Sequence, residues 1–374
     1  MPPSLYIHIP FCRKKCPYCD FYSITCYGGL ASDYIAALIK QIRELGVEVA
    51  SIYIGGGTPT VLGYDLWDKL FTSLKRFIKN GIEFTVEANP ESLKADILKL
   101  FLEGGVNRLS IGVQSLRDEK LKALGRIHTA KSARDALLAA ARAGFKNISM
   151  DLIFGTGRED IADWKKELKE AAGLAVTHIS CYGLTYEKDT PLFNALEKKL
   201  VTALEDEVVA RMYEWAVGYL ESRGFKRYEV SNFARQGYFC RHNLNYWENN
   251  PYIGLGPSAV SYINGERKEN IPDTKEYVMR VKRGEDLTIS REKLSPVAKA
   301  KETAALKIRT AEGISLKWFE EKAGFDFLKL QKESLAQLSD NGLIDFAKNN
   351  NKITRVYLTK KGFLYCDAAS SAFV

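Results

Sequence analysis

The run IHIPFCRKKCPYCDF at residues 7–21 holds three cysteines, Cys12, Cys16 and Cys19, in the spacing C-x3-C-x2-C. Three thiolates packed this closely do not form a disulfide framework in a chain of ordinary globular size, but they can hold a metal cluster. A four-iron, four-sulfur cluster usually has four thiolate ligands, so three leave one iron open. An open coordination position is typical of a site that carries out chemistry. We therefore expect a reactive iron–sulfur cluster at these cysteines.

A structural zinc ion is the alternative at the same cysteines, and it would need a fourth ligand. Cys26 or His8 could supply that ligand. Zinc sites usually combine two separated pairs of ligands, so the compact triplet favours the cluster.

The composition fits a folded protein of one large and one small domain. The chain has 374 residues, of which 46% are hydrophobic and 27% charged, enough to bury a full core. Four of the seven cysteines are scattered, which fits a reducing compartment. No apolar run approaches the roughly 20 residues that span a bilayer, and an apolar strand follows Met1 too soon for a signal peptide. We expect a cytoplasmic protein.

The net charge of +8, from 54 basic and 46 acidic residues, is mild and spread along the chain. It is compatible with an anionic small molecule, a membrane surface or RNA, and it selects none of them.

Strand-like and helix-like segments alternate through the first two-thirds of the chain. Strands are predicted at residues 5–9, 51–54, 83–87, 108–112, 147–153 and 178–182. Alternation of this kind indicates an α/β fold with a parallel sheet and helices outside it. Six units are too few for a closed eightfold barrel, so we expect a partial (βα)6 TIM-like barrel. Chemistry gathers at the carboxyl ends of such strands, where the cysteine loop lies.

The pattern changes near residue 226, which divides the chain into three parts. Residues 1–225 form the predicted barrel. Residues 226–295 read as a possible last strand at 226–234, a loop-rich aromatic stretch and a charged connector. Residues 296–374 follow the order helix, helix, helix, hairpin, helix, which predicts a small winged-helix-like domain.

A glycine-rich turn, Gly55-Gly56-Gly57-Thr58, follows the second predicted strand. Consecutive glycines let a ligand approach the backbone and leave free N–H donors. The turn lacks the lysine and the spacing of a nucleotide-phosphate loop.

Polar residues interrupt or follow the ends of the next strands, namely Glu87, Gln114, Arg126 and Asp151. Burying them without partners would be costly, and an active-site ligand is one suitable partner. The alternative is a salt bridge between Arg126 and Asp151 inside the barrel.

These motifs together resemble the radical S-adenosylmethionine (SAM) superfamily. The resemblance implies a 4Fe–4S cluster whose open iron is chelated by SAM. It also implies that the SAM pocket includes Tyr6, Gly56, Gly57, Thr58, Glu87, Gln114, Arg126 and Asp151. Tyr6 has the alternative role of an aromatic packed inside the barrel. Tyr18 and Phe21 are expected to form an apolar wall that shields the cluster.

Shared blocks such as GGTPT at residues 56–60 and EANP at residues 87–90 narrow the resemblance to the oxygen-independent coproporphyrinogen III dehydrogenases and their relatives. Two departures argue against decarboxylation: Phe21 stands where those enzymes carry a further cysteine, and their N-terminal extension is absent. Whether the chain is an enzyme is therefore left open.

The block HNLNYW at residues 242–247 resembles the HemW subgroup, regarded as haem chaperones. The resemblance implies haem binding by His242, since imidazole is a common axial ligand and flanking aromatics suit a flat macrocycle. Cys240 is a competing ligand. His8 and His178 are interpreted as structural, and His128 as close to the site.

The sequence thus predicts a cytoplasmic protein that binds a 4Fe–4S cluster, SAM and haem. It would deliver haem to an acceptor, such as a respiratory haem protein at the membrane face. A homodimer is left open. The alternative function is oxidative decarboxylation of coproporphyrinogen III. RNA modification is the third hypothesis, but the tail is not notably basic, so no nucleic-acid partner is expected.

Overall fold

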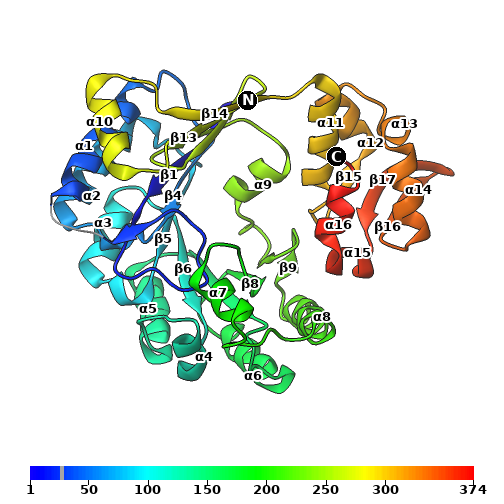
Figure 1. Cartoon of the computed structure of the whole chain (residues 1–374), viewed down its shortest axis with the longest axis horizontal. Helices are drawn as coiled ribbons and strands as arrows, with labels where there is room; N and C mark the ends of the chain where they lie inside the picture. Colours follow the sequence, from blue (N-terminus) through cyan, green and yellow to red (C-terminus); the bar gives the residue numbers. More distant parts are fainter. Residues whose placement is uncertain (26–28) are drawn as a thin grey trace.

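A mixed sheet of twelve strands forms the larger part of the computed structural model, which describes residues 1–25 and 29–374 (Figure 1). Within these residues six neighbouring parallel strands follow one another in chain order. They are β1 (Ser4–Ile9), β4 (Ser51–Gly56), β5 (Glu83–Ala88), β6 (Arg108–Gln114), β7 (Asn147–Phe154) and β8 (His178–Gly183). The six predicted strands are therefore confirmed.

Helices connect these strands, and most of them lie outside the curved sheet (Figure 1). They are α1 (Leu30–Glu44), α2 (Tyr64–Leu74), α3 (Ala95–Glu103), α4 (Asp118–Ala123), α5 (Ala130–Ala143), α6 (Ile161–Ala171) and α8 (Asp206–Ser222). α7 (Pro191–Glu197) instead lies at the cysteine loop, where the Leu192 amide donates to the Pro17 carbonyl at 2.8 Å. The described residues also contain three short 3-10 helices, which lie between β4 and α3. They are η1 (Pro59–Val61), η2 (Lys75–Phe77) and η3 (Pro90–Ser92). The partial (βα)6 barrel is confirmed.

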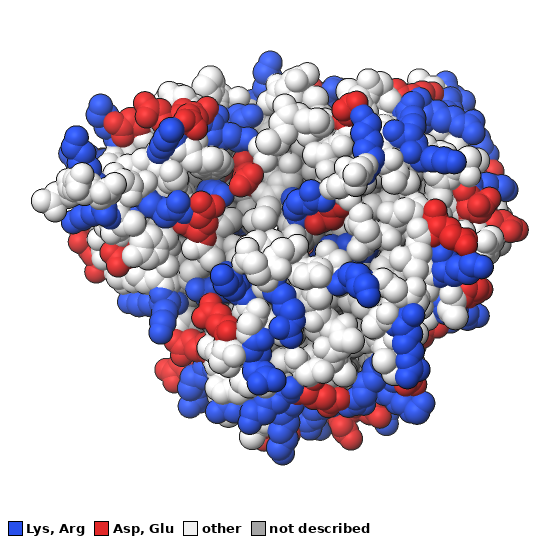
Figure 2. Space-filling model, turned by 180° about the vertical axis from the view of Figure 1, so that it is seen from behind, with Lys and Arg blue, Asp and Glu red and all other residues white. Residues whose placement is uncertain are grey.

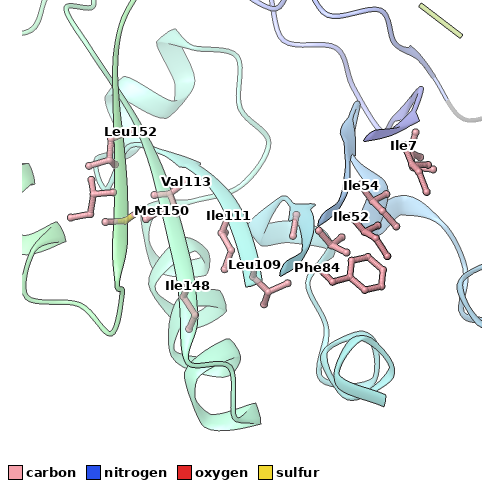
Figure 3. Packing of buried hydrophobic residues seen from close by; sticks show 14 of the residues in the cluster. Ile7, Ile52, Ile54, Phe84, Leu109, Ile111, Val113, Ile148, Met150 and Leu152 are labelled. Atoms are coloured by element: carbon pink, nitrogen blue, oxygen red, sulfur yellow. The ribbon is translucent and has the colours of Figure 1, made fainter. Parts of the chain in front are cut away.

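The strands alternate between an apolar face and a polar face. In β4, Ile52 and Ile54 are buried in the hydrophobic core with Leu109 and Ile111 of β6 (Figure 3). Such a side chain contributes about 1.5–3 kcal/mol when fully buried. Because successive side chains point to opposite faces, Tyr53 lies on the other face, where its hydroxyl reaches β5. The inside of the barrel is therefore lined largely by polar and aromatic groups.

The predicted last strand at residues 226–234 is confirmed as two short strands, β9 (Lys226–Arg227) and β10 (Asn232–Ala234), which extend the sheet beyond β8. The remainder of residues 226–295 does not form the predicted loop-rich stretch and connector. On the other edge, β11 (Tyr252–Leu255) pairs in parallel with β1, and β12 (Val260–Ile263), β13 (Glu266–Asn270) and β14 (Thr288–Lys293) follow it. α10 (Thr274–Arg283) packs on α1. In β13 and β14 apolar and polar residues do not alternate. The two strands are instead joined by ion pairs between their side chains, such as Arg267 with Glu292.

The chain crosses from β10 to β11 through the short helix α9 (Arg241–Trp247), which contacts β4. In Figure 1 this helix lies between the barrel and the C-terminal domain. The helix therefore lies beside the opening that the partial barrel leaves between its two edges.

The C-terminal part follows the predicted order of helices and hairpin. It contains α11 (Pro296–Lys307), β15 (Ile314–Ser315), α12 (Leu316–Ala323), α13 (Phe327–Leu330), α14 (Lys332–Asp340), β16 (Ile344–Asn349), β17 (Lys352–Leu358), α15 (Lys360–Leu364) and α16 (Cys366–Ser371). Gln331 separates α13 from α14, and its buried side-chain amide donates to the Phe373 carbonyl. α11 packs against α9, where Lys307 pairs with Glu248.

Among the helices that the structure describes, none is both long and apolar enough to cross a membrane.

Candidate functional site

The cysteine loop follows β1 and is attached to the glycine-rich turn by backbone hydrogen bonds. It contains β2 (Phe11–Cys12), which pairs with β3 (Ile24–Thr25). The Gly57 amide donates to the Ile9 carbonyl at 2.8 Å and the Thr58 amide to the Phe11 carbonyl at 2.7 Å. A Cβ atom at Gly57 would lie 2.7 Å from the Phe11 oxygen, so only glycine allows this approach. The amides predicted to be free donors therefore hold the cysteine loop.

Glu87, at the end of β5, accepts two hydrogen bonds across the inside of the barrel. Tyr53 Oη donates to Oε1 at 2.7 Å and the Gly56 amide donates to Oε2 at 3.1 Å. Burial raises the pKa of this carboxyl group to about 7, although the Tyr53 hydrogen bond opposes the shift. Glu87 can therefore exchange a proton near neutral pH.

Two of the three cysteines are joined by a chain of hydrogen bonds, which we call the Thr58–Asn89–Arg126 bridge. Thr58 Oγ1 donates to Cys12 Sγ at 3.6 Å, and Asn89 Nδ2 donates to Thr58 Oγ1 at 2.9 Å. Arg126 Nη2 donates to Asn89 Oδ1 at 2.7 Å, and its Nη1 donates to Cys16 Sγ at 3.5 Å. Such bonds to sulfur stabilise negative charge on a cluster.

Asn89 is a site residue that the sequence analysis did not single out. Its signal was its place in the EANP block, directly after β5. An asparagine there reads as a turn residue, and only the structure shows that its amide joins Thr58 to Arg126.

The predicted alternative of an Arg126–Asp151 salt bridge is wrong. Arg126 binds Asn89, the Gly112 carbonyl and Cys16. Asp151 instead accepts a hydrogen bond from Ser180 Oγ at 2.8 Å. Burial raises the pKa of Asp151 above its usual range. Arg126 therefore contacts the cysteine loop and the ends of β5 and β6, whereas Asp151 contacts β8.

Tyr18 and Phe21 do not form one wall over the cluster. Burial raises the pKa of the Tyr18 phenol, and Arg126 and Cys16 are among the charged neighbours that affect it. Burial likewise raises the pKa of Cys19. Phe21 is 64% exposed, because the loop turns its side chain to solvent. The exposure of Phe21 contradicts its predicted shielding role, and the role of Tyr18 stays a prediction.

Tyr6 and Gln114 also lie along the inside and rim of the barrel. Tyr6 Oη lies 3.1 Å from His8 Nδ1, and Glu87 is among the groups that affect its pKa, which burial raises. Gln114 ends β6 with left-handed backbone, at φ 62°. This conformation turns the chain sharply toward Ser115 at the strand end.

The histidines near the cysteines are occupied by protein groups. His8 Nε2 lies 2.9 Å from the Tyr22 carbonyl, so with Tyr6 both ring nitrogens are engaged. Its interpretation as structural is confirmed, and a zinc ligand role is not supported. Cys26, the other candidate for that role, lies outside the described residues. His128 contacts Glu91 at 3.4 Å beside Arg126.

His242 lies at the opposite end of the barrel from the cysteines. Its Nδ1 is 2.8 Å from Ser51 Oγ, where β4 begins, and its Nε2 is 3.2 Å from Tyr246 Oη. Its ring packs on Tyr53 with centroids 4.9 Å apart. Burial lowers the pKa of His242 to about 3, and the charge of Arg108 contributes. The imidazole is therefore neutral at physiological pH.

Glu83, the first residue of β5, fixes α9 in this position. Its carboxylate accepts hydrogen bonds from the backbone amides of Arg241 at 3.0 Å and His242 at 2.9 Å. Cys240 is buried beside it, and burial raises the pKa of its thiol to about 12. His178 is also buried, with its ring nitrogens 2.8 Å from Ser149 Oγ and Tyr228 Oη. Its structural interpretation is confirmed.

The predicted residues thus form two groups. The cysteines, the glycine-rich turn, Glu87 and Arg126 gather at the carboxyl ends of the strands. His242 and Cys240 gather where the strands begin.

Comparisons with known proteins identify the family. Residues 6–171 match the sequence model of the Radical SAM superfamily. The heme chaperone HemW of Bacillus subtilis is 36% identical over 99% of both chains. That of Lactococcus lactis is 33% identical over 97% of this chain and 94% of its own. The solved structure of coproporphyrinogen III oxidase (HemN) from Escherichia coli, a radical SAM enzyme, has a TM-score of 0.85 at 23% identity, covering 100% of this chain and 90% of that one. That likeness shows a shared fold, and the full-length sequence similarity shows that this chain belongs to the HemW family within the radical SAM superfamily.

Proposed function

We propose that this protein is a cytoplasmic haem chaperone that binds a 4Fe–4S cluster, SAM and haem. The observation that carries the proposal is the division of one barrel into two sites, with three thiols at one end and a neutral histidine at the other. Full-length similarity to proteins named heme chaperone supports it. The expected acceptor is a haem protein at the membrane face, and the homodimer remains a hypothesis.

The residues present fit the cluster and SAM. Cys12, Cys16 and Cys19 would ligate the cluster, with donors from Thr58 and Arg126 already directed at two of the sulfurs. When bound, the cluster and SAM supply one-electron reduction of the sulfonium group. The SAM pocket would comprise Tyr6, Gly56, Gly57, Thr58, Glu87, Gln114, Arg126 and Asp151, and Tyr18 would shield the cluster. Of these, Glu87 is suited to accept a hydrogen bond from the SAM amino group.

Haem binding at His242 requires α9 to move away from β4, because the histidine is only 1% exposed. A neutral imidazole can bind iron without first losing a proton, and Tyr53 and Tyr246 offer aromatic surface. Tyr246 Oη lies at Nε2, so the iron must displace this hydroxyl. Cys240 is the weaker candidate, because a thiol with a pKa of about 12 remains protonated.

No nucleic-acid partner is proposed. Figure 2 shows basic side chains interspersed with acidic ones over one whole face of the molecule, although the net charge is +8. Nucleic-acid binding generally uses a continuous basic patch or stripe.

Replacing His242 by alanine tests haem binding directly. Anaerobic titration of cluster-reconstituted protein with haem should give a saturable Soret band in the wild type. His242→Ala should weaken binding by about tenfold or more, since one coordination bond is lost. Cys240→Ser, just before the same helix, is the control and should retain binding.

Equal haem affinity of His242→Ala and the wild type would remove His242 from the proposed site. If the wild type forms no saturable complex, the chaperone proposal fails. Decarboxylation of coproporphyrinogen III with SAM and a reductant would then be assayed, because the HemN fold is shared over the whole chain.

The Thr58–Asn89–Arg126 bridge should raise the reduction potential of the cluster. Asn89→Ala removes the partner that orients both sulfur donors, so the more negative, reduced cluster is less stabilised. We expect a potential lower by on the order of 50 mV, about 1 kcal/mol for one electron. A redox titration followed by electron paramagnetic resonance measures it. Thr58→Val loses the Cys12 contact and the acceptor for Asn89 Nδ2 but keeps the Arg126 contacts with Asn89 and Cys16, so it should shift the potential less. An unchanged potential in Asn89→Ala would contradict the role.

A further inference from the structure

Tyr22 joins the cysteine loop to α10, a helix far away in the sequence. Its hydroxyl accepts a hydrogen bond at 2.9 Å from the backbone amide of Thr274, the first residue of α10, and lies 3.1 Å from Thr274 Oγ1. The carbonyl oxygen of Tyr22 lies 2.9 Å from His8 Nε2. One residue of the loop therefore contacts both α10 and the end of β1.

His8 gives the Tyr22 carbonyl a donor that does not change. The histidine is 5% exposed, and burial lowers its pKa, so the ring is neutral at physiological pH. Because Nε2 faces a carbonyl oxygen, it carries the ring proton and donates it, and Nδ1 is left to accept from Tyr6 Oη at 3.1 Å. A Cβ atom on Gly56 would lie 2.5 Å from the ring, so the glycine-rich turn packs directly on it.

α10 is itself held firmly beside the same histidine. Tyr34 of α1 donates a hydrogen bond to the His8 carbonyl, and a Cβ atom on Gly256, which follows β11, would lie 2.7 Å from that oxygen. The Gly256 amide donates to Tyr277 Oη of α10 at 3.1 Å. α10 also packs on α1 (Figure 1). The partner of the Tyr22 hydroxyl is therefore fixed from two sides.

The cysteine loop has less side-chain support at its third cysteine than at the other two. Cys12 and Cys16 accept hydrogen bonds from side chains, whereas Cys19 accepts none from a side chain among the described residues. Burial raises the pKa of Cys19, and a backbone hydrogen bond at Phe21 opposes that shift. Tyr22 is the next residue in the chain. Its anchoring therefore fixes the backbone that follows the third thiol.

We propose that Tyr22 is a positioning residue for the iron–sulfur cluster, and that it holds the Cys19 end of the loop by joining α10 to His8. This inference rests on the cluster of the proposed function. A cluster stays bound only while its thiolates stay in place, so opening one end of the loop should release iron. The contacts of the Tyr22 hydroxyl and carbonyl oppose that opening.

Iron release to a chelator, from reconstituted full-length protein under anaerobic conditions, tests the proposal. Tyr22→Phe loses only the hydroxyl and should release iron about tenfold faster than the wild type, since outer contacts of metal ligands commonly change metal affinity by roughly 10–100-fold. Thr274→Val keeps the amide donor and should give an intermediate rate. Tyr213→Phe is the matched control. Its hydroxyl, on α8, also has two partners, the Val230 carbonyl and Arg227, and its loss should leave iron release unchanged.

Hydrogen exchange of the protein without its cluster gives a second readout. Residues 10–25 should exchange faster in Tyr22→Phe than in the wild type, and at the wild-type rate in Tyr213→Phe. Equal iron release from the two variants would assign Tyr22 to general stability and overturn the proposal, as would unchanged exchange of the loop in Tyr22→Phe. If the reconstituted wild type holds no cluster, the proposed function fails instead, and the exchange comparison still tests the anchor.

Discussion

Replacing Lys120 by methionine should destabilise the protein by about 3–5 kcal/mol, because it leaves two buried carboxylates without their cation. Lys120 Nζ lies 2.6 Å from Glu159 Oε1 and 2.8 Å from Glu167 Oε2. The three side chains are 5%, 1% and 0% exposed. Burial of a charge is tolerated only where it is paired and hydrogen-bonded, so removing one member affects the other two.

The two carboxylates also fix the loops at the carboxyl ends of β6 and β7. Glu159 Oε2 accepts hydrogen bonds from the amides of Gly155 at 2.9 Å and Thr156 at 3.2 Å. Glu167 Oε1 accepts one from the Leu116 amide at 2.6 Å. Gln114 lies two residues before that amide. Loss of Lys120 should therefore loosen the rim that carries the SAM residues.

Chemical denaturation monitored by circular dichroism measures the loss for Lys120→Met. Lys122→Met, an exposed lysine on the same helix, is the control and should change the free energy of unfolding by less than about 0.5 kcal/mol. Similar unfolding midpoints for the two variants would contradict the role given to the buried cluster.

The sequence predicted the sheet because its strands carry a strong local signal. Strands such as residues 147–153 carry apolar residues at alternate positions (Ile148, Met150 and Leu152), and Gly144 and Gly173 mark the ends of the preceding helix and the following one. The ribbon of β13 and β14 could not be predicted in this way. Its side chains are stabilised by ion pairs across the strands, so the same residues read as a solvated connector.

The sequence predicted which residues belong to the site better than it predicted their hydrogen-bond partners. Spacing alone identified the cysteines, because a loop motif is local in the chain. The partner of Arg126 depends on which strand ends meet, and the structure gives it Asn89 in place of Asp151. The burial of His242 depends on Glu83 and Ser51, far away in the sequence. Long-range contacts of this kind leave no pattern in one sequence.

The affinity for SAM should rise with pH up to about 7 and then level off. Glu87 has a pKa of about 7 in the free protein because burial disfavours its charge. A hydrogen bond donated by the SAM amino group favours the ionised carboxylate, so binding lowers this pKa and releases a proton. Below pH 7 the affinity should fall by up to tenfold per pH unit, because the proton must first be removed.

Calorimetry of cluster-reconstituted protein between pH 5.5 and 8.5, in buffers of different ionisation enthalpy, measures both the affinity and the released proton. Glu87→Gln should bind SAM with a flat pH profile, weaker than the wild type at pH 8 and similar to it near pH 5.5. Glu91→Gln, whose carboxyl pKa is already lowered, should keep the wild-type slope.

A second variant tests whether the released proton comes from Glu87 or from Asp151. The carboxylate of Asp151 raises the pKa of Glu87, and the Arg108 charge lowers it. Asp151→Asn should therefore move the bend in the profile to lower pH without abolishing it. A slope that survives in Glu87→Gln and disappears in Asp151→Asn would assign the proton to Asp151, whose pKa is also raised by burial. The SAM amino group would then lie nearer to β7 than to β5.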